Sequence, residues 1–313
     1  MTMAFLSRPT PLKRPTLLIV GCGDVGMRVA KLLRGRWRVL ALTSSADRVA
    51  TLRAAGVLPL VGDLDRPASL ARLADLADAV LHLAPPPPSG RTDPRTANLL
   101  RALARGSRVR RIVYASTSGV YGDCAGARID ETRAPNPATD RARRRLDAET
   151  RLRWFGRAFG ARVTLLRIPG IYAIDRPGGD PRERIARGTP VLVASDDVYT
   201  NHIHADDLAR ACVAALHRGR AQRALNVSDD SELRMGDYFD LVADIHGLAR
   251  PPRIARADAE RHFAPMAMSF LGESRRLDNT RLVRELRLRL RYPRVDDGLR
   301  AGPGDGPRRA EVR

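Results

Sequence analysis

The chain has few cysteines, almost no lysine and no long apolar segment. Its three cysteines, Cys22, Cys124 and Cys212, lie far apart and include no Cys-x-x-Cys pair, which argues against a disulfide scaffold and a cysteine zinc site. No apolar run reaches the roughly 18 residues of a membrane span, and Thr16–Val20 is too short for a signal peptide. These absences predict a cytoplasmic protein that neither spans nor binds a membrane.

Basic residues exceed acidic ones by 20, and all but two of the 55 basic residues, Lys13 and Lys31, are arginine. The arginines are spread along the chain, usually near an acid. We interpret them as a compositional bias at surface positions where any long cation suffices. The alternative is attraction of anions, from a phosphorylated cofactor to nucleic acid. Because no known nucleic-acid module is present, we expect no specific nucleic-acid partner.

Strands and helices alternate through the first half of the chain. The predicted strands are Thr16–Val20, Arg38–Leu42, Val57–Val61, Ala79–Leu83, Arg110–Ala115 and Val163–Ile168. The predicted helices between them are Val25–Leu33, Arg48–Ala55, Ala68–Leu76, Thr96–Ala104 and Asp140–Phe159. This alternation predicts an α/β fold, with a doubly wound parallel sheet of the Rossmann type that helices cover on both faces.

The alternation ends after Pro169, and the rest of the 313 residues suggests a second, smaller unit. We predict a helix at Leu208–Leu216 capped by Asp206 or Asp207. The predicted segments are a disordered basic arm (1–15), a dinucleotide-binding domain (16–169, to which 196–230 returns), a mostly helical substrate lobe (170–195 and 231–300) and a disordered tail (301–313). We expect the lobe at the carboxyl edge of the sheet, where such folds bind ligands.

A glycine-rich loop, Gly21-Cys22-Gly23-Asp24-Val25-Gly26, joins the first strand to the first helix. Gly21 permits the tight turn, Gly23 lets the backbone approach a pyrophosphate, and Gly26 lets helix and strand pack closely. The N–H groups at the helix start are free to bind phosphate. We therefore predict a dinucleotide site that includes Gly21, Gly23, Asp24, Val25 and Gly26. A glycine-rich turn without a ligand is the alternative.

The end of the second strand distinguishes NADP from NAD. An NAD site carries an Asp or Glu there for the ribose 2′-hydroxyl, whereas this chain has Leu42-Thr43-Ser44-Ser45, followed by Arg48. Two hydroxyl groups and a guanidinium suit a 2′-phosphate. We predict NADP as the cofactor, with NAD less favoured, bound by Thr43, Ser44 and Arg48. The alternative role of Ser44 or Ser45 is to cap the next helix.

The segment Tyr114-Ala115-Ser116-Thr117-Ser118-Gly119-Val120-Tyr121-Gly122 resembles the extended short-chain dehydrogenase/reductase superfamily, which includes NAD-dependent epimerases and dehydratases. Further matching segments are Gly62-Asp63-Leu64, Leu83-Ala84-Pro85, Arg167-Ile168-Pro169-Gly170-Ile171-Tyr172 and Asn201-His202-Ile203-His204-Ala205-Asp206-Asp207. The resemblance covers about residues 16–300. It implies a cofactor site that also contains Asp63, Leu64, Leu83, Ala84, Pro85, Ser116, Pro169 and Ile171.

The chain departs from this superfamily at the catalytic tyrosine and lysine. Alignment on Glu149 puts Arg141 at the tyrosine position and Arg145 at the lysine position, and no tyrosine or lysine lies between Gly122 and Glu149. A guanidinium stays protonated at physiological pH, so neither arginine acts as a general acid or base. The chain thus resembles an atypical member. Arg141, Arg145 and Glu149 share one face of the predicted helix. The two arginines are candidates for binding a cofactor phosphate, the ribose or an anionic substrate, and we assign Arg145 to the cofactor. A solvated helix face is the alternative for all three residues.

Thr117 aligns with the residue that orients the substrate carbonyl. Tyr121, Tyr172 and His202 are candidates for the missing proton donor, and lining a wall of the cleft is the alternative for Tyr172. Packing behind the loop is the alternative for Tyr121, and a structural hydrogen bond is the alternative for His202. His202 and His204 form a His-x-His pair, but no further ligand is evident nearby, so we predict no metal site.

Two functions follow from these features. The first is an NADP-dependent oxidoreductase of the epimerase/dehydratase type, which acts on a small carbonyl, alcohol or sugar-like substrate with a non-standard proton donor. The second is a protein that senses NADP(H) without turnover. In either case we expect a monomer or homodimer, and for the enzyme a small-molecule substrate. Fold analogy supports the cofactor better than any particular reaction.

Overall fold

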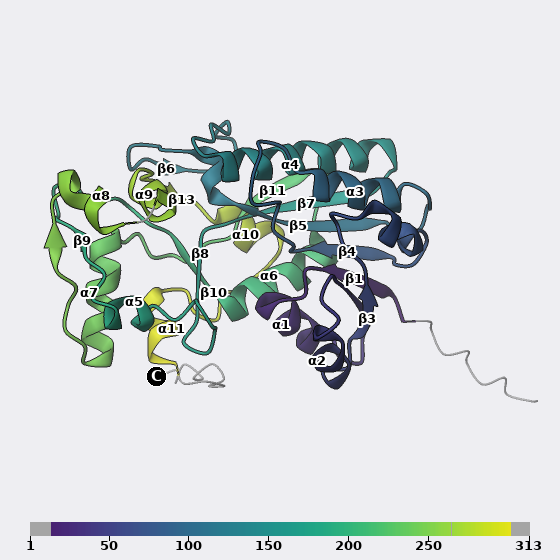
Figure 1. The fold of residues 1–313 in the computed structure, drawn as a ribbon, viewed down its shortest axis with the longest axis horizontal. Helices are drawn as coiled ribbons and strands as arrows, with labels where there is room; N and C mark the ends of the chain where they lie inside the picture. Colours follow the sequence, from purple (N-terminus) through teal and green to yellow (C-terminus); the bar gives the residue numbers. More distant parts are fainter. Residues whose placement is uncertain (1–13, 264, 302–313) are drawn as a thin grey trace, which may run out of the picture.

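Seven parallel strands form the central sheet, in the order β11-β7-β5-β4-β1-β2-β3 (Figure 1). The strands are β1 (Thr16–Val20), β2 (Arg38–Thr43), β3 (Leu58–Val61), β4 (Ala79–His82), β5 (Arg111–Thr117), β7 (Arg162–Ile168) and β11 (Arg223–Asn226). The computed structural model describes residues 14–263 and 265–301, so most of the predicted arm 1–15 and tail 301–313 lies outside the described residues. The predicted doubly wound α/β sheet is confirmed.

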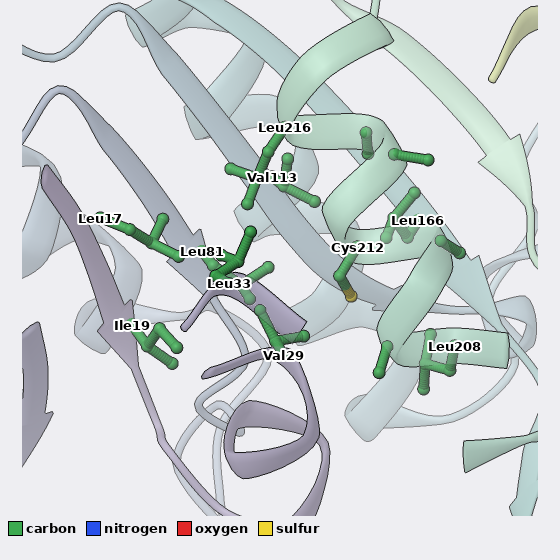
Figure 2. Packing of buried hydrophobic residues seen from close by; sticks show 14 of the residues in the cluster. Leu17, Ile19, Val29, Leu33, Leu81, Val113, Leu166, Leu208, Cys212 and Leu216 are labelled. Carbon is green, nitrogen blue, oxygen red and sulfur yellow. The ribbon is translucent and has the colours of Figure 1, made fainter. Parts of the chain in front are cut away.

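Alternate residues of β1 face opposite layers of helices. Leu17 and Ile19 pack with α1 (Asp24–Leu33) and α6 (Ala205–Arg218), as Figure 2 shows. Leu18 and Val20 belong to the cluster on the other face, against α3 (Pro94–Leu103) and α4 (Asp140–Ala158). Because both faces are covered, the strand is apolar throughout, which is typical of a buried parallel sheet. Helix α2 (Arg48–Ala54) follows β2 in the chain.

One predicted helix type and one predicted helix cap are wrong. The segment predicted as a helix at Ala68–Leu76 is a 3₁₀ helix, η1 (Pro67–Leu73), whose buried Leu70 and Leu73 have the three-residue spacing of that helix. The helix predicted at Leu208–Leu216 begins earlier, as α6. Its cap is His204, whose Nδ1 accepts a hydrogen bond from the Asp206 N–H at 3.2 Å.

Asp206 and Asp207, predicted as caps, lie in the first turn of α6 and bind other segments. Asp206 accepts a hydrogen bond from Arg28 on α1 at 2.5 Å. The Asp207 carboxylate accepts hydrogen bonds from the N–H groups of Arg291 and Tyr292 at 2.7–2.9 Å. Both carboxylates therefore connect α6 to distant parts of the chain, which local sequence does not reveal.

The second half forms a lobe at one side of the sheet (Figure 1). Its helices are α5 (Arg182–Ala186), α7 (Met235–His246), α8 (Ala259–His262), α9 (Pro265–Leu271) and α11 (Val295–Arg300), with the short 3₁₀ helix η3 (Arg256–Asp258). Short strand pairs accompany them: β8 (Gly170–Tyr172) with β10 (His202–His204), β9 (Val191–Leu192) with β12 (Arg253–Ile254), and β6 (Arg128–Ile129) with β13 (Arg276–Leu277). Helix α10 (Thr280–Glu285) and β11 return to the sheet domain, and η2 (Ser118–Tyr121) follows β5.

The lobe has an apolar core of its own, distinct from the two clusters that flank the sheet. Tyr238, Phe239 and Val242 of α7 pack there against Val191 and Val295. Within the described residues, no helix is both long and apolar enough to cross a membrane.

Candidate functional site

Two cavities lie at the carboxyl ends of the sheet strands, and we call them the cofactor cavity and the substrate cavity. The cofactor cavity has a volume of about 450 Å³. Ten predicted cofactor residues line it: Gly21, Gly23, Thr43, Ser44, Arg48, Asp63, Leu64, Leu83, Ala84 and Pro85. They come from the ends of β1, β2, β3 and β4, so the sheet brings together motifs that are up to about sixty residues apart.

The glycines of the first loop shape this cavity in different ways. A Cβ on Gly21 would lie 2.5 Å from the backbone nitrogen of Ala84, and Gly21 has φ +84°, so only glycine suits this turn. A Cβ on Gly23 would meet no atom within 4 Å. No side chain caps α1, which starts just after Gly23. The open space and the free N–H groups fit a dinucleotide pyrophosphate.

Gly26, Asp24 and Val25 do not line either cavity. A Cβ on Gly26 would lie 3.1 Å from Cys22 Sγ and 3.3 Å from Ile19, which is the close helix–strand packing expected of the third glycine. The Asp24 carboxylate pairs with Arg28 at 3.1 Å and with Arg176 at 3.3 Å. Val25 packs against the hydrophobic core. The side chains of Asp24 and Val25 therefore point to structural partners.

Arg48 extends from the first turn of α2 to the glycine loop. Its Nη2 donates a hydrogen bond to the Cys22 carbonyl at 2.9 Å, and it lines the cofactor cavity with Thr43 and Ser44. Among the described residues, no carboxylate forms an ion pair with Arg48. No side chain caps α2, so the alternative capping role of Ser44 and Ser45 is wrong. The Thr43 hydroxyl instead bonds with the backbone of Ser45 at 3.3 Å.

The substrate cavity has a volume of about 260 Å³ and lies between the sheet edge and the lobe. Thr117, Ser118, Gly119 and Pro169 line it from the ends of β5 and β7. Side chains from elsewhere complete it: Arg141 of α4, Arg184 of α5, Tyr199, Asn201, Met235, Phe263, Phe270, Glu273 and Arg275. The Thr117 Oγ1 accepts a hydrogen bond from the Gly119 N–H at 3.2 Å, so its own proton is free to be donated.

A buried polar network lies beneath the ends of β5 and β7. The Ser116 hydroxyl donates to Glu149 at 2.6 Å, and Arg167 forms an ion pair with Glu149 at 2.9 Å, with both charged side chains almost fully buried. The bonds to Glu149 hold the pKa of Arg167 above its usual value despite burial. Ser116, predicted to bind the cofactor, is therefore part of this network and lines neither cavity.

Arg145 also lies beneath the strand ends. Its Nη1 donates to the Ala115 carbonyl at 2.7 Å and to the Tyr114 hydroxyl at 3.2 Å. Arg141 lines the substrate cavity, Arg145 is half-buried and Glu149 is buried. The alternative of a solvated helix face for these three residues is therefore wrong.

The structure places Tyr121 away from both cavities. Its hydroxyl donates to Asn226 Oδ1 at 2.7 Å in the protein interior, and burial raises the pKa of Tyr121 to about 12. Arg167 stacks over its ring, with the guanidinium carbon 4.7 Å from the ring centroid. Because the phenol is buried and already bonded, it is not positioned to donate a proton to a substrate in the cavity.

His202 is also buried away from the cavity. Its ring stacks on Tyr238 with the centroids 3.9 Å apart, and burial lowers the pKa of His202 to about 3. Ile171 on the adjacent strand β8, predicted to bind the cofactor, packs against the core. Within the described part of the chain, no group of three or more His, Cys, Asp and Glu residues is arranged to hold a metal ion.

Several cavity residues were missed by the sequence prediction. Arg95 lines the cofactor cavity and pairs with Asp65 at 2.6 Å. Arg184, Phe270 and Glu273 line the substrate cavity. Arg184, Phe270 and Glu273 belong to the irregular second half, where no motif marks them, so only the packing of the lobe against the sheet reveals their position. Arg95 lies in the first turn of α3, just before the predicted helix Thr96–Ala104.

Comparison with known proteins agrees with this architecture. The model of the NAD-dependent epimerase/dehydratase family matches residues 17–228, more than half of the chain. Protein YeeZ of Escherichia coli (strain K12) is 27% identical over 288 residues, which cover 88% of this chain and 95% of that protein.

Solved structures show the same fold. A functionally unknown conserved protein from Silicibacter pomeroyi has a TM-score of 0.77 and 29% identity, covering 91% of this chain and 96% of its own. The UDP-glucuronic acid 4-epimerase from Bacillus cereus, solved in complex with NAD, has a TM-score of 0.72 and 18% identity, with the same coverage. At that identity the second likeness shows the fold alone.

Proposed function

Because the chain belongs to the NAD-dependent epimerase/dehydratase family, within the extended short-chain dehydrogenase/reductase superfamily, we propose that it is an NADP(H)-dependent oxidoreductase. Its substrate is a small carbonyl, alcohol or sugar-like compound. The observation that carries the cofactor choice is Arg48, whose guanidinium lies in the cofactor cavity against the glycine loop, without a carboxylate partner among the described residues.

Arg48 supports NADP over NAD through charge. The end of β2 offers the Thr43 and Ser44 hydroxyl groups and no acid, so nothing there repels a 2′-phosphate. A charge-assisted hydrogen bond contributes about 1.5–3 kcal/mol, which corresponds to about tenfold to a hundredfold in affinity. One donor of Arg48 is held by the Cys22 carbonyl, which fixes the side chain and leaves further N–H groups for a ligand.

When bound, a nicotinamide nucleotide donates or accepts a hydride. In this chain the Thr117 hydroxyl is available to orient a substrate oxygen, because its oxygen accepts from Gly119 while its proton remains free. Neither Arg141 nor Arg145 supplies a proton. General acid catalysis is worth about 10²–10⁴-fold, so we expect turnover on ordinary carbonyl substrates to be slow.

A non-catalytic NADP(H) sensor is the second candidate. The observation that favours it is the burial of Tyr121, Tyr172 and His202 away from the substrate cavity, which leaves no replacement among the predicted proton donors. The two candidates share the cofactor and differ only in turnover. A cytoplasmic location and a monomeric or homodimeric state stay predictions.

Calorimetric titration of NADP and NAD into the wild type, Arg48→Ala and Arg53→Ala tests the cofactor. Arg53 is the matched control, since it is exposed at the other end of α2. We expect Arg48→Ala to weaken NADP about tenfold to a hundredfold and to leave NAD unchanged, with no effect of Arg53→Ala. Equal affinity of the wild type for the two nucleotides would refute the NADP assignment.

Oxidation of NADPH with a panel of ketones, aldehydes and sugars then separates enzyme from sensor. Measurable turnover with any member, abolished by Thr117→Val, supports the enzyme. Tight NADP binding without turnover of any member supports the sensor.

A further inference from the structure

The substrate cavity contains more positive than negative charge. Arg141, Arg184 and Arg275 line it, with Glu273 as the one carboxylate among its described residues. Glu273 is already paired with Arg275 at 2.8 Å, and Arg275 donates a second bond to the Gly122 carbonyl at 2.7 Å. This leaves the charges of Arg141 and Arg184 to be accounted for.

Arg141 lies on the first turn of α4 and has no acid partner of its own. Its guanidinium stacks over Phe270, with the central carbon 4.6 Å from the ring centroid. Among the described residues, none forms an ion pair with it. Burial lowers the pKa of Arg141. The charge of Glu273 raises this pKa, whereas the charges of Arg145, Arg144 and Arg275 lower it further.

Among the described residues, no carboxylate forms an ion pair with Arg184 on α5. Its Nη2 donates to the Pro190 carbonyl at 3.2 Å, and its guanidinium carbon lies 4.4 Å from the Phe239 ring centroid. Its buried Nε has no hydrogen-bond partner in the described part of the chain. Burial lowers the pKa of Arg184, and Arg187 lowers it further. In each case desolvation of the charge is not offset by an ion pair.

Two partly buried guanidinium groups without carboxylate partners are stabilised when an anion enters the same cavity. We propose that the substrate is a small anion, whose carboxylate or phosphate group binds Arg141 while Arg184 contributes a second positive charge. The inference rests on the proposed function in taking this cavity as the substrate site. A volume of about 260 Å³ suits a small molecule.

The binding of malonate and of inorganic phosphate to NADP-saturated protein tests this proposal by calorimetry. Saturation with NADP keeps the anions out of the Arg48 region. Malonamide, which has the shape of malonate without its charge, is the neutral control. A preference for malonate indicates a carboxylate substrate, and a preference for phosphate indicates a phosphate ester.

The variants are Arg141→Gln, Arg141→Lys, Arg184→Gln and the control Arg157→Gln. Arg157 is an exposed arginine on the same helix, outside both cavities. We expect about tenfold weaker anion binding in Arg141→Gln, a smaller loss in Arg184→Gln, retained binding in Arg141→Lys, and no effect of Arg157→Gln. Binding of NADP should be unchanged in all four variants.

Absence of saturable anion binding, or an equal loss in Arg157→Gln, would overturn the proposal, because an arginine-rich surface alone then explains any association. If the wild type does not bind NADP, the cofactor assignment fails separately. In that case, titration of malonate and phosphate into nucleotide-free Arg48→Ala protein tests the anion site without relying on the cofactor assignment.

Discussion

The cofactor cavity and the substrate cavity lie at the same edge of one sheet but are built differently. The cofactor cavity consists of short motifs at the ends of β1, β2, β3 and β4, with Arg95 from α3 added. The substrate cavity combines the end of β5 with helices and loops from residue 141 to residue 275. The first is lined mainly by residues that contiguous motifs predict, whereas the second includes Arg141, which the family resemblance aligns with the catalytic tyrosine. The cofactor motifs and the substrate cavity thus lie on different parts of the fold.

The largest effect is expected from the network of Ser116, Glu149 and Arg167 beneath the ends of β5 and β7. Glu149→Gln leaves the buried Arg167 without its counter-charge, and breaking such a pair costs about 3–5 kcal/mol. Urea unfolding should show this loss. Calorimetry should show weaker malonate binding in the substrate cavity, which the ends of β5 and β7 line. Asp140→Asn on the same helix, which removes an exposed ion pair with Arg143, is the control and should change the stability far less. Similar losses in the two variants would contradict the structural role of the network.

An intermediate effect, confined to the cofactor cavity, is expected from two glycines. Gly21→Ala brings a Cβ against the Ala84 backbone and strains a residue with positive φ, which should cost about 1–3 kcal/mol and abolish NADP binding. Gly23→Ala has room for its Cβ, so stability should stay unchanged while NADP affinity falls. Malonate binding in the substrate cavity should be unaffected by Gly23→Ala. Full NADP affinity in that variant would show that no phosphate approaches the loop.

The smallest effect concerns pH and compares two buried histidines, one in the central sheet and one in the strand pair β8–β10. Burial lowers the pKa of His82 on β4 and of His202 on β10 to about 3. Between that value and the unfolded pKa of about 6.5 the unfolded chain binds more protons, so stability falls as pH decreases. Each histidine should contribute about 1.4 kcal/mol per pH unit. This slope should be fully developed below about pH 6.

His82→Phe and His202→Phe should each reduce this dependence by the same amount, measured as the difference in urea stability between pH 7.5 and pH 5. If only one variant keeps the pH dependence of the wild type, the region around that histidine opens to solvent before the other region does. That result would break the assumption that both regions unfold together.

The sequence determined the sheet, the phosphate loop and most of the cofactor cavity. These depend on strand alternation and on contiguous motifs, since parallel strands bring their carboxyl ends to one edge whatever the loops contain. Ten of the predicted cofactor residues line one cavity for this reason. The sequence also shows that no tyrosine or lysine lies between Gly122 and Glu149.

Only the tertiary structure decided which polar residues line the two cavities. Ser116 and Arg145 match a cofactor pattern, but their bonds to Glu149 and to the Ala115 carbonyl hold them beneath the cavities. Tyr121 and His202 are titratable in isolation, yet burial against Asn226 and Tyr238 removes them from the site. Conversely, Arg184 lines the substrate cavity because α5 packs against the core of the lobe. Burial and long-range partners depend on the whole fold, and no local pattern encodes them.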